Sequence, residues 1–154
     1  MKAVIQRVTR ASVRVDDQLV GEIERGVLVL LGVMKGDGER QVLKLARDVA
    51  TFRIFPDGQR PMHLSLLDLN LAALVVSQFT LAADGRKGRR PSFDKAAPPD
   101  LARPLVERFV AELRELGVPV STGRFQAMMR VELVNDGPAT FVLETPAVPG
   151  EGPR

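Results

Sequence analysis

Three short stretches of this sequence carry residue types from which a catalytic or binding site is built. The first is Ser77–Thr80 (SQFT), which follows the apolar run at 74–76 (LVV). The second is Asn135–Thr140 (NDGPAT), and the third is Arg86–Pro91 (RKGRRP). Hydroxyl and amide groups hydrogen-bond carbonyl substrates, and clustered cations bind phosphates. Each stretch also has an ordinary structural explanation that must be weighed against the functional one.

The SQFT stretch is predicted to continue a strand at 71–81. On an extended strand, Gln78 and Thr80 lie on one face, while Ser77 and Phe79 lie on the other. A strand that emerges into solvent explains this polarity equally well. In the floor of a pocket, backbone N–H groups near Gln78 and Phe79 would instead stabilise a developing oxyanion. Loss of one such donor typically lowers a rate by about 10²–10³-fold.

The NDGPAT stretch is rich in residues that favour turns. It predicts the turn of a hairpin that joins strands at 125–134 and 140–144. The signal is weak by itself, because most Gly-Pro bonds in folded proteins are trans.

The RKGRRP stretch places Arg86, Lys87, Arg89 and Arg90 in a long connection at 84–99. Charge runs are commonly solvated loops, and four cations in five positions equally suit contact with phosphates. Composition alone leaves both explanations open.

The composition excludes several kinds of active site. The chain has no Cys and a single His, His63, so it has no thiolate nucleophile, no multi-histidine metal site and few ways to build a Ser-His-Asp triad. We expect no metal and no cofactor. The N-terminus is too short and polar for a signal peptide, and no apolar run reaches the ~20 residues that span a bilayer. We therefore expect a soluble, cytoplasmic protein with no membrane partner.

Two of these stretches resemble the signature motifs of one family. SQFTL at 77–81 and NDGPAT at 135–140 are similar to the motifs of the D-aminoacyl-tRNA deacylases, formerly called D-tyrosyl-tRNA deacylases. The resemblance runs from about residue 1 to 144 and includes the following segments: AVIQRV at 3–8, VLVLLGV at 27–33, RKGRRPSF at 86–93 and TGRF at 122–125. The chain departs from the family at His63, where Asn is common, and at Met128, where an acidic residue is common.

The resemblance implies a homodimer that hydrolyses the ester of D-aminoacyl-tRNA, releases free tRNA and the D-amino acid, and rejects L-aminoacyl-tRNA. It also implies removal of glycine mischarged on tRNA(Ala). The residues that it places around the reacting ester are Ser77, Gln78, Phe79 and Thr80.

The resemblance assigns further roles at the subunit interface. Gly137 and Pro138 form a cis dipeptide that enters the partner's active site as a chiral filter. Arg7 orients this dipeptide, and Phe125 and Met129 surround the terminal adenosine. The cations at 86–90 contact the tRNA.

Two alternatives remain open. Thr80 would be a covalent nucleophile if a base took its proton. The chain would be a non-catalytic RNA-binding module if the basic loop at 86–90 were its only functional site.

The elements that must position these residues follow from hydrophobic periodicity. The apolar run at 27–33 is typical of a strand covered on both faces. Apolar residues at helical spacing predict one helix through 42–49 and a second through 105–116. We expect an α/β fold: a single domain, 1–145, of curled or barrel-like mixed β-sheets with two helices packed outside. Residues 146–154 are expected to be a disordered tail.

Overall fold

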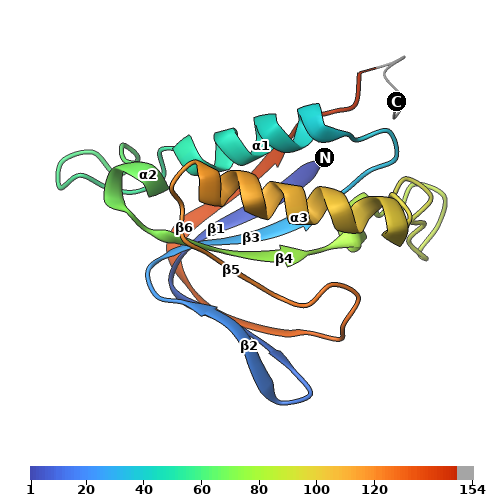
Figure 1. Ribbon diagram of the computed structural model, residues 1–154, viewed down its shortest axis with the longest axis horizontal. Helices are drawn as coiled ribbons and strands as arrows, with labels where there is room; N and C mark the ends of the chain where they lie inside the picture. Colours follow the sequence, from blue (N-terminus) through green and yellow to red (C-terminus); the bar gives the residue numbers. More distant parts are fainter. Residues whose placement is uncertain (149–154) are drawn as a thin grey trace.

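The strands nearest the two ends of the chain pair with each other over most of their length. The computed structural model describes residues 1–148. In it, β1 (Lys2–Val15) runs antiparallel to β6 (Arg130–Glu144), from the pair Lys2–Glu144 to the pair Arg14–Arg130. In Figure 1 the two strands lie side by side in the sheet.

The remaining strands extend from the other edge of β1. They are β2 (Gln18–Ile23), β3 (Gly26–Gly32), β4 (Ala72–Ser77) and β5 (Val120–Thr122). Their order is β2-β1-β3-β4-β5, in which β3, β4 and β5 run parallel to one another. β1 pairs with β3 through its first half and with β2 through its second half.

This sheet curls until its two ends meet. The hydroxyl of Ser121 on β5 donates to the backbone oxygen of Glu22 on β2 at 2.9 Å. At Gly21 a Cβ atom would lie 2.3 Å from the backbone oxygen of Thr122, so only glycine permits this approach. The mixed sheet is therefore nearly closed, as the expectation of a barrel-like fold requires.

Helices α1 (Glu39–Thr51) and α3 (Pro99–Glu115) cover one face of the sheet (Figure 1). They are the two helices that the periodicity predicts. A one-turn helix, α2 (Leu66–Leu69), and a 3₁₀ helix, η1 (Phe79–Ala82), lie in the connections. The main core fills the space between helices and sheet, and its largest fully buried side chains include Phe55, Phe109 and Leu45. A second, smaller cluster fills the inside of the curl. The predicted fold class is confirmed.

Two local predictions are wrong. The strand expected at 71–81 ends at Ser77, and the chain then turns into η1, so the side chains of 77–80 do not alternate between two faces. The hairpin expected across 135–138 does not form, because both halves of β6 pair with β1. Asn135 pairs with Val8 and Thr140 with Gln6, so residues 136–139 bulge out of the ladder opposite Arg7. The tail prediction falls partly on residues 149–154, which lie outside the described residues.

Candidate active site

A cavity of about 770 Å³ opens where β4 ends. Its walls are η1, the first turn of α3 and the segment at 125–129 that leads into β6. It brings together six residues that the resemblance assigns to the site: Ser77, Gln78, Phe79, Thr80, Phe125 and Met129.

The transition from β4 to η1 decides which backbone donors face this cavity. The N–H of Gln78 donates to the backbone oxygen of Leu31 at 2.8 Å, so it is already used by the sheet. Within residues 1–148, neither the N–H of Phe79 nor that of Thr80 has a bonded acceptor. The first N–H groups of a helix lack intrahelical partners. The expected oxyanion donors are therefore Phe79 and Thr80, and the expectation for Gln78 is wrong.

Side chains of the SQFT stretch support this turn and shape the mouth of the cavity. The amide Nε2 of Gln78 donates to the hydroxyl oxygen of Thr80, which ties the two side chains together. The ring of Phe79 is 58% exposed and meets the edge of Phe93 at 5.2 Å between centroids.

Phe125 and Met129 form the opposite wall. The guanidinium of Arg103 on α3 lies 4.7 Å from the centroid of the Phe125 ring. Met129 packs against the smaller core cluster, and a Cβ at Gly123 would lie 2.6 Å from its sulfur. Met128, which precedes Met129 in the chain, is 91% exposed. Phe125 and Met129 are thus held by neighbours, whereas Met128 is free to contact another molecule.

Gly137 and Pro138 do not line the cavity of their own chain. They lie in the bulge of β6, and the peptide bond between them is cis, as the resemblance implies. A Cβ at Gly137 would lie 2.7 Å from the side-chain oxygen of Asn135. The amide of Asn135 donates to the backbone oxygens of Arg7 and Ala139 at 2.9 and 3.3 Å, which closes the bulge from inside.

Arg7 anchors the bulge from β1. Its Nε donates to the backbone oxygen of Asp136 at 2.8 Å and lies 3.3 Å from the Asp136 carboxylate. Its Nη1 donates to the backbone oxygen of Ile54 at 2.6 Å. Arg7 is 8% exposed, so its bond to Ile54 is shielded from water and its bond to Asp136 is partly shielded. The geometry agrees with an arginine that orients the dipeptide.

The basic loop projects from the rim near the start of α3 (Figure 1). Asp84 bridges to Ser92 and closes the loop at its base. The Arg86 side chain bonds Asp84 and holds the pKa of that carboxyl well below its ordinary value. Lys87, Arg89 and Arg90 are exposed. Arg86 is exposed as well, but its ion pair with Asp84 gives it a structural role in the loop.

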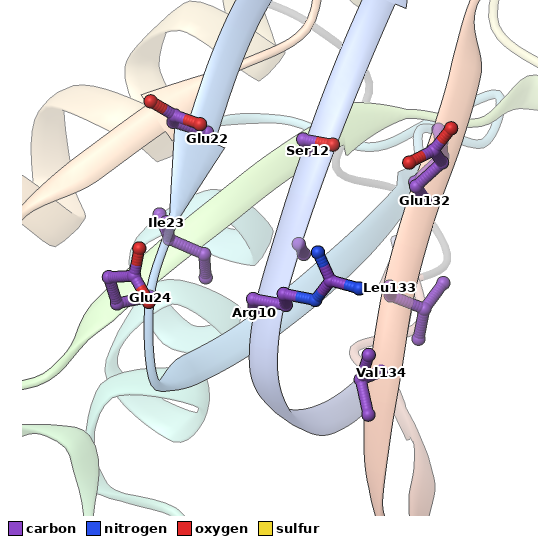
Figure 2. Close-up of a pocket in the computed structure, with 10 residues that line it drawn as sticks. Arg10, Ser12, Glu22, Ile23, Glu24, Glu132, Leu133 and Val134 are labelled. Atoms are coloured by element: carbon purple, nitrogen blue, oxygen red, sulfur yellow. The ribbon is translucent and has the colours of Figure 1, made fainter.

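Two further features lie outside this assembly. His63 approaches Asp57 at 3.6 Å and does not line the cavity. A groove of about 530 Å³ lies between β2, β1 and β6, with Arg10 among the carboxylates of Glu22, Glu24 and Glu132 (Figure 2). This groove contains none of the residues that the sequence singled out.

Among residues 1–148, no group of three or more acidic or histidine side chains is arranged to hold a metal ion. No helix in that range is long and apolar enough to cross a membrane.

Sequence reasoning missed two contributors to this region. Arg103 is one of many charges on an amphipathic helix, and only the fold brings it over Phe125. β5 has three residues, too few for a periodic signal, yet its pairing with β4 carries residues 122–125 to the cavity.

Comparison with known proteins places these features in a family. Residues 4–144 match the family model described as D-Tyr-tRNA(Tyr) deacylase. A D-aminoacyl-tRNA deacylase of Geotalea uraniireducens (strain Rf4) is 58% identical over 154 residues, 100% of this chain and 99% of the relative. One of Geobacter metallireducens (strain ATCC 53774 / DSM 7210 / GS-15) is 59% identical over 150 residues, covering 97% and 99%.

Solved structures agree in fold. The structure described as the c-Myc DNA Unwinding Element Binding Protein superposes with a TM-score of 0.89 at 40% identity, covering 96% of this chain and all of that one. A probable eukaryotic D-amino acid tRNA deacylase superposes at 0.80 and 18% identity, covering 92% and 97%, which shows a shared fold.

Proposed function

The chain belongs to the D-Tyr-tRNA(Tyr) deacylase family, and from that premise we propose how its residues divide the work of D-aminoacyl-tRNA hydrolysis. The protein is a deacylase that cleaves the ester of D-aminoacyl-tRNA. The ester would bind in the cavity at the end of β4, with the terminal adenosine against Phe125 and Met129. We expect it to act in the cytoplasm, where tRNA is aminoacylated.

The observation that carries this assignment is the pair of unbonded N–H groups at Phe79 and Thr80. As water attacks the ester carbon, negative charge develops on the carbonyl oxygen. Two preorganised N–H donors stabilise that charge more than they stabilise the neutral ester, which lowers the barrier. The N–H of Gln78 takes no part, since Leu31 already accepts it.

Hydrolysis of this ester would not require a strong base in the cavity. An aminoacyl ester is more reactive than an amide, so its barrier is lower from the start. The 2′-hydroxyl of the terminal ribose would orient the attacking water, and positioning supplies a further reduction of the barrier. Thr80 would act through its N–H and its size, because its hydroxyl accepts a hydrogen bond from Gln78 and bonds no basic side chain within residues 1–148.

The chiral filter would come from a second copy of the chain. The Gly137-Pro138 dipeptide protrudes from β6 and is held by Arg7, but it lies outside its own cavity. In a homodimer, its backbone would enter the partner's cavity beside the Cα of the substrate. An L side chain would collide with that backbone, whereas a D side chain would point outward. Glycine has no side chain to exclude, so glycyl-tRNA would also be cleaved.

Turnover separates this function from the alternative of a non-catalytic RNA-binding module. Purified protein is incubated with a tenfold excess of D-tyrosyl-tRNA, and released tyrosine is counted per chain. We expect many turnovers per chain. Release at the spontaneous rate, with tRNA binding intact, would favour the binding module, in which the exposed cations of the loop are the functional site.

The dimer is tested by complementation. A chain with a defective filter and a chain with a defective cavity are mixed under conditions that exchange subunits. We expect D-over-L discrimination to return in the mixture, because one of the two sites combines an intact filter with an intact cavity. A fully active and selective monomer in sedimentation would contradict the shared site.

A further inference from the structure

A second groove adjoins the ester cavity along α3. Its volume is about 380 Å³, and it shares two wall residues, Ser77 and Phe125, with the cavity. Three arginines line it: Arg103, Arg114 and Arg124. We propose that this groove binds the phosphodiester groups of the tRNA 3′ strand next to the terminal adenosine. The inference rests on the proposed ester site.

Two of the three arginines lie along one side of α3. Arg103 and Arg114 lie on the same side of α3, with Glu107 and Val110 between them at helical spacing. Their separation along the helix axis is about 16 Å at 1.5 Å per residue. Arg124 faces them from the segment that follows β5. The cations therefore span enough length for more than one phosphate.

Each guanidinium keeps donors for a ligand. Arg103 donates to the side-chain oxygen of Gln126 at 3.3 Å, and Arg114 donates to the backbone oxygen of Val120 at 3.0 Å. An arginine has five N–H donors, so one such bond fixes the side chain and leaves others for phosphate oxygens. All three arginines are exposed, which leaves them accessible to a nucleic acid.

The position of Arg103 connects the groove to the ester site. Its guanidinium lies over the ring of Phe125, which lines both cavities. If the terminal base packs against Phe125, the phosphate on its 5′ side falls within one nucleotide of Arg103. An aromatic wall followed by a basic groove is the usual arrangement for a single strand. Glu107 lowers the positive charge of the groove. Removing its negative charge should therefore strengthen phosphate binding, the opposite effect to removing an arginine.

The experiment compares two D-tyrosylated substrates, adenosine alone and the 3′-terminal trinucleotide of tRNA. The wild type is expected to favour the trinucleotide at least tenfold in kcat/KM, mainly through KM. Replacing the three arginines together by Gln should remove most of this preference. Replacing them by Lys should keep most of it, because charge is retained. Glu107→Gln should lower KM for the trinucleotide only. Arg47→Gln, an exposed cation on α1, serves as the control.

Several outcomes would overturn the proposal. One is a wild type that does not prefer the trinucleotide. The others are a triple Gln variant that keeps the preference, or one that loses kcat/KM equally on both substrates. In parallel, binding of the labelled trinucleotide without an attached amino acid is measured by fluorescence anisotropy. Arginine-dependent binding without hydrolysis of any D substrate would support the groove and refute the ester site. Binding that does not depend on the arginines would overturn the groove.

Discussion

The Nε of Arg7 donates to the backbone oxygen of Asp136 at 2.8 Å, so a buried side chain of β1 holds the residue that precedes Gly137-Pro138. The same guanidinium also bonds Ile54, outside the sheet. This links the bulge of β6 to two separate parts of the fold. This linkage holds the Gly137-Pro138 dipeptide rigid. A backbone that rejects an L side chain by collision must be rigid, because a flexible one would move aside.

Arg7→Met tests the anchor. The substitution keeps an unbranched apolar stem and removes the charge, which leaves two carbonyl oxygens without their donor. Hydrogen bonds to charged groups contribute about 1.5–3 kcal/mol each, so the loss of two should lower the free energy of unfolding, measured with urea, by about 3–6 kcal/mol. D-over-L discrimination should fall as well. The control Arg47→Met on α1 should change stability by less than about 0.5 kcal/mol. Unchanged stability and selectivity would refute the role of Arg7.

Gly137→Ala tests the inside of the bulge. The added Cβ would lie 2.7 Å from the Asn135 side-chain oxygen, so that amide must move and its bonds to Arg7 and Ala139 weaken. We expect a loss of about 1–3 kcal/mol in unfolding free energy, together with poorer discrimination. Gly85→Ala is the matched control, because nothing lies within 4 Å of its added Cβ. Equal effects of the two substitutions would argue against a tightly packed bulge.

Much of the fold could be predicted from local patterns. The apolar run at 27–33 and the helical spacing of Val42, Leu45, Ala46 and Val49 indicate burial directly, and the structure buries all of these residues except Leu30, which is partly buried. The hairpin across 135–138 was mispredicted for a physical reason. Turn residues signal a change in chain direction, but they cannot reveal that β1 is long enough to pair with both flanks. The same turn residues therefore form a bulge.

The candidate site could be predicted in its composition but less in its geometry. The residue types at 77–80 indicate a carbonyl site, yet the alternation of a strand misplaces them, because η1 begins at Phe79. The use of the Gln78 N–H by Leu31 depends on pairing between distant strands. Arg103 reaches Phe125 only through the packing of α3, for which the sequence has no local signal.

Thr80→Ala distinguishes a pocket residue from a nucleophile. The substitution removes a hydroxyl that accepts one hydrogen bond from Gln78 and keeps the backbone N–H. The loss should correspond to about 0.5–1.5 kcal/mol, or roughly tenfold in single-turnover rate. Thr80→Ser should be closer to the wild type. Complete loss in a folded variant, with an acyl adduct trapped on Thr80 in the wild type, would establish covalent catalysis instead.

The basic loop should contribute affinity without selectivity. Neutralising Lys87, Arg89 and Arg90 should weaken tRNA binding and reduce the slope of log affinity against log salt by about 2, at roughly 0.7 per single-strand phosphate contact. D-over-L discrimination should survive. Arg86→Gln should act differently, since it removes the side-chain bonds of Arg86 to Asp84, leaves the ion pair of that carboxylate with Lys95, and loosens the base of the loop. Loss of discrimination with affinity intact would assign the loop to the chiral pocket.

The most direct test of the account is the rate of ester cleavage for two substrates that differ only in chirality. D-tyrosyl-tRNA and L-tyrosyl-tRNA are prepared on the same tRNA, and single-turnover release is measured with saturating protein. The account predicts rapid cleavage of the D ester and cleavage of the L ester at its spontaneous rate. Comparable cleavage of both esters would contradict a site filtered by the Gly137-Pro138 backbone.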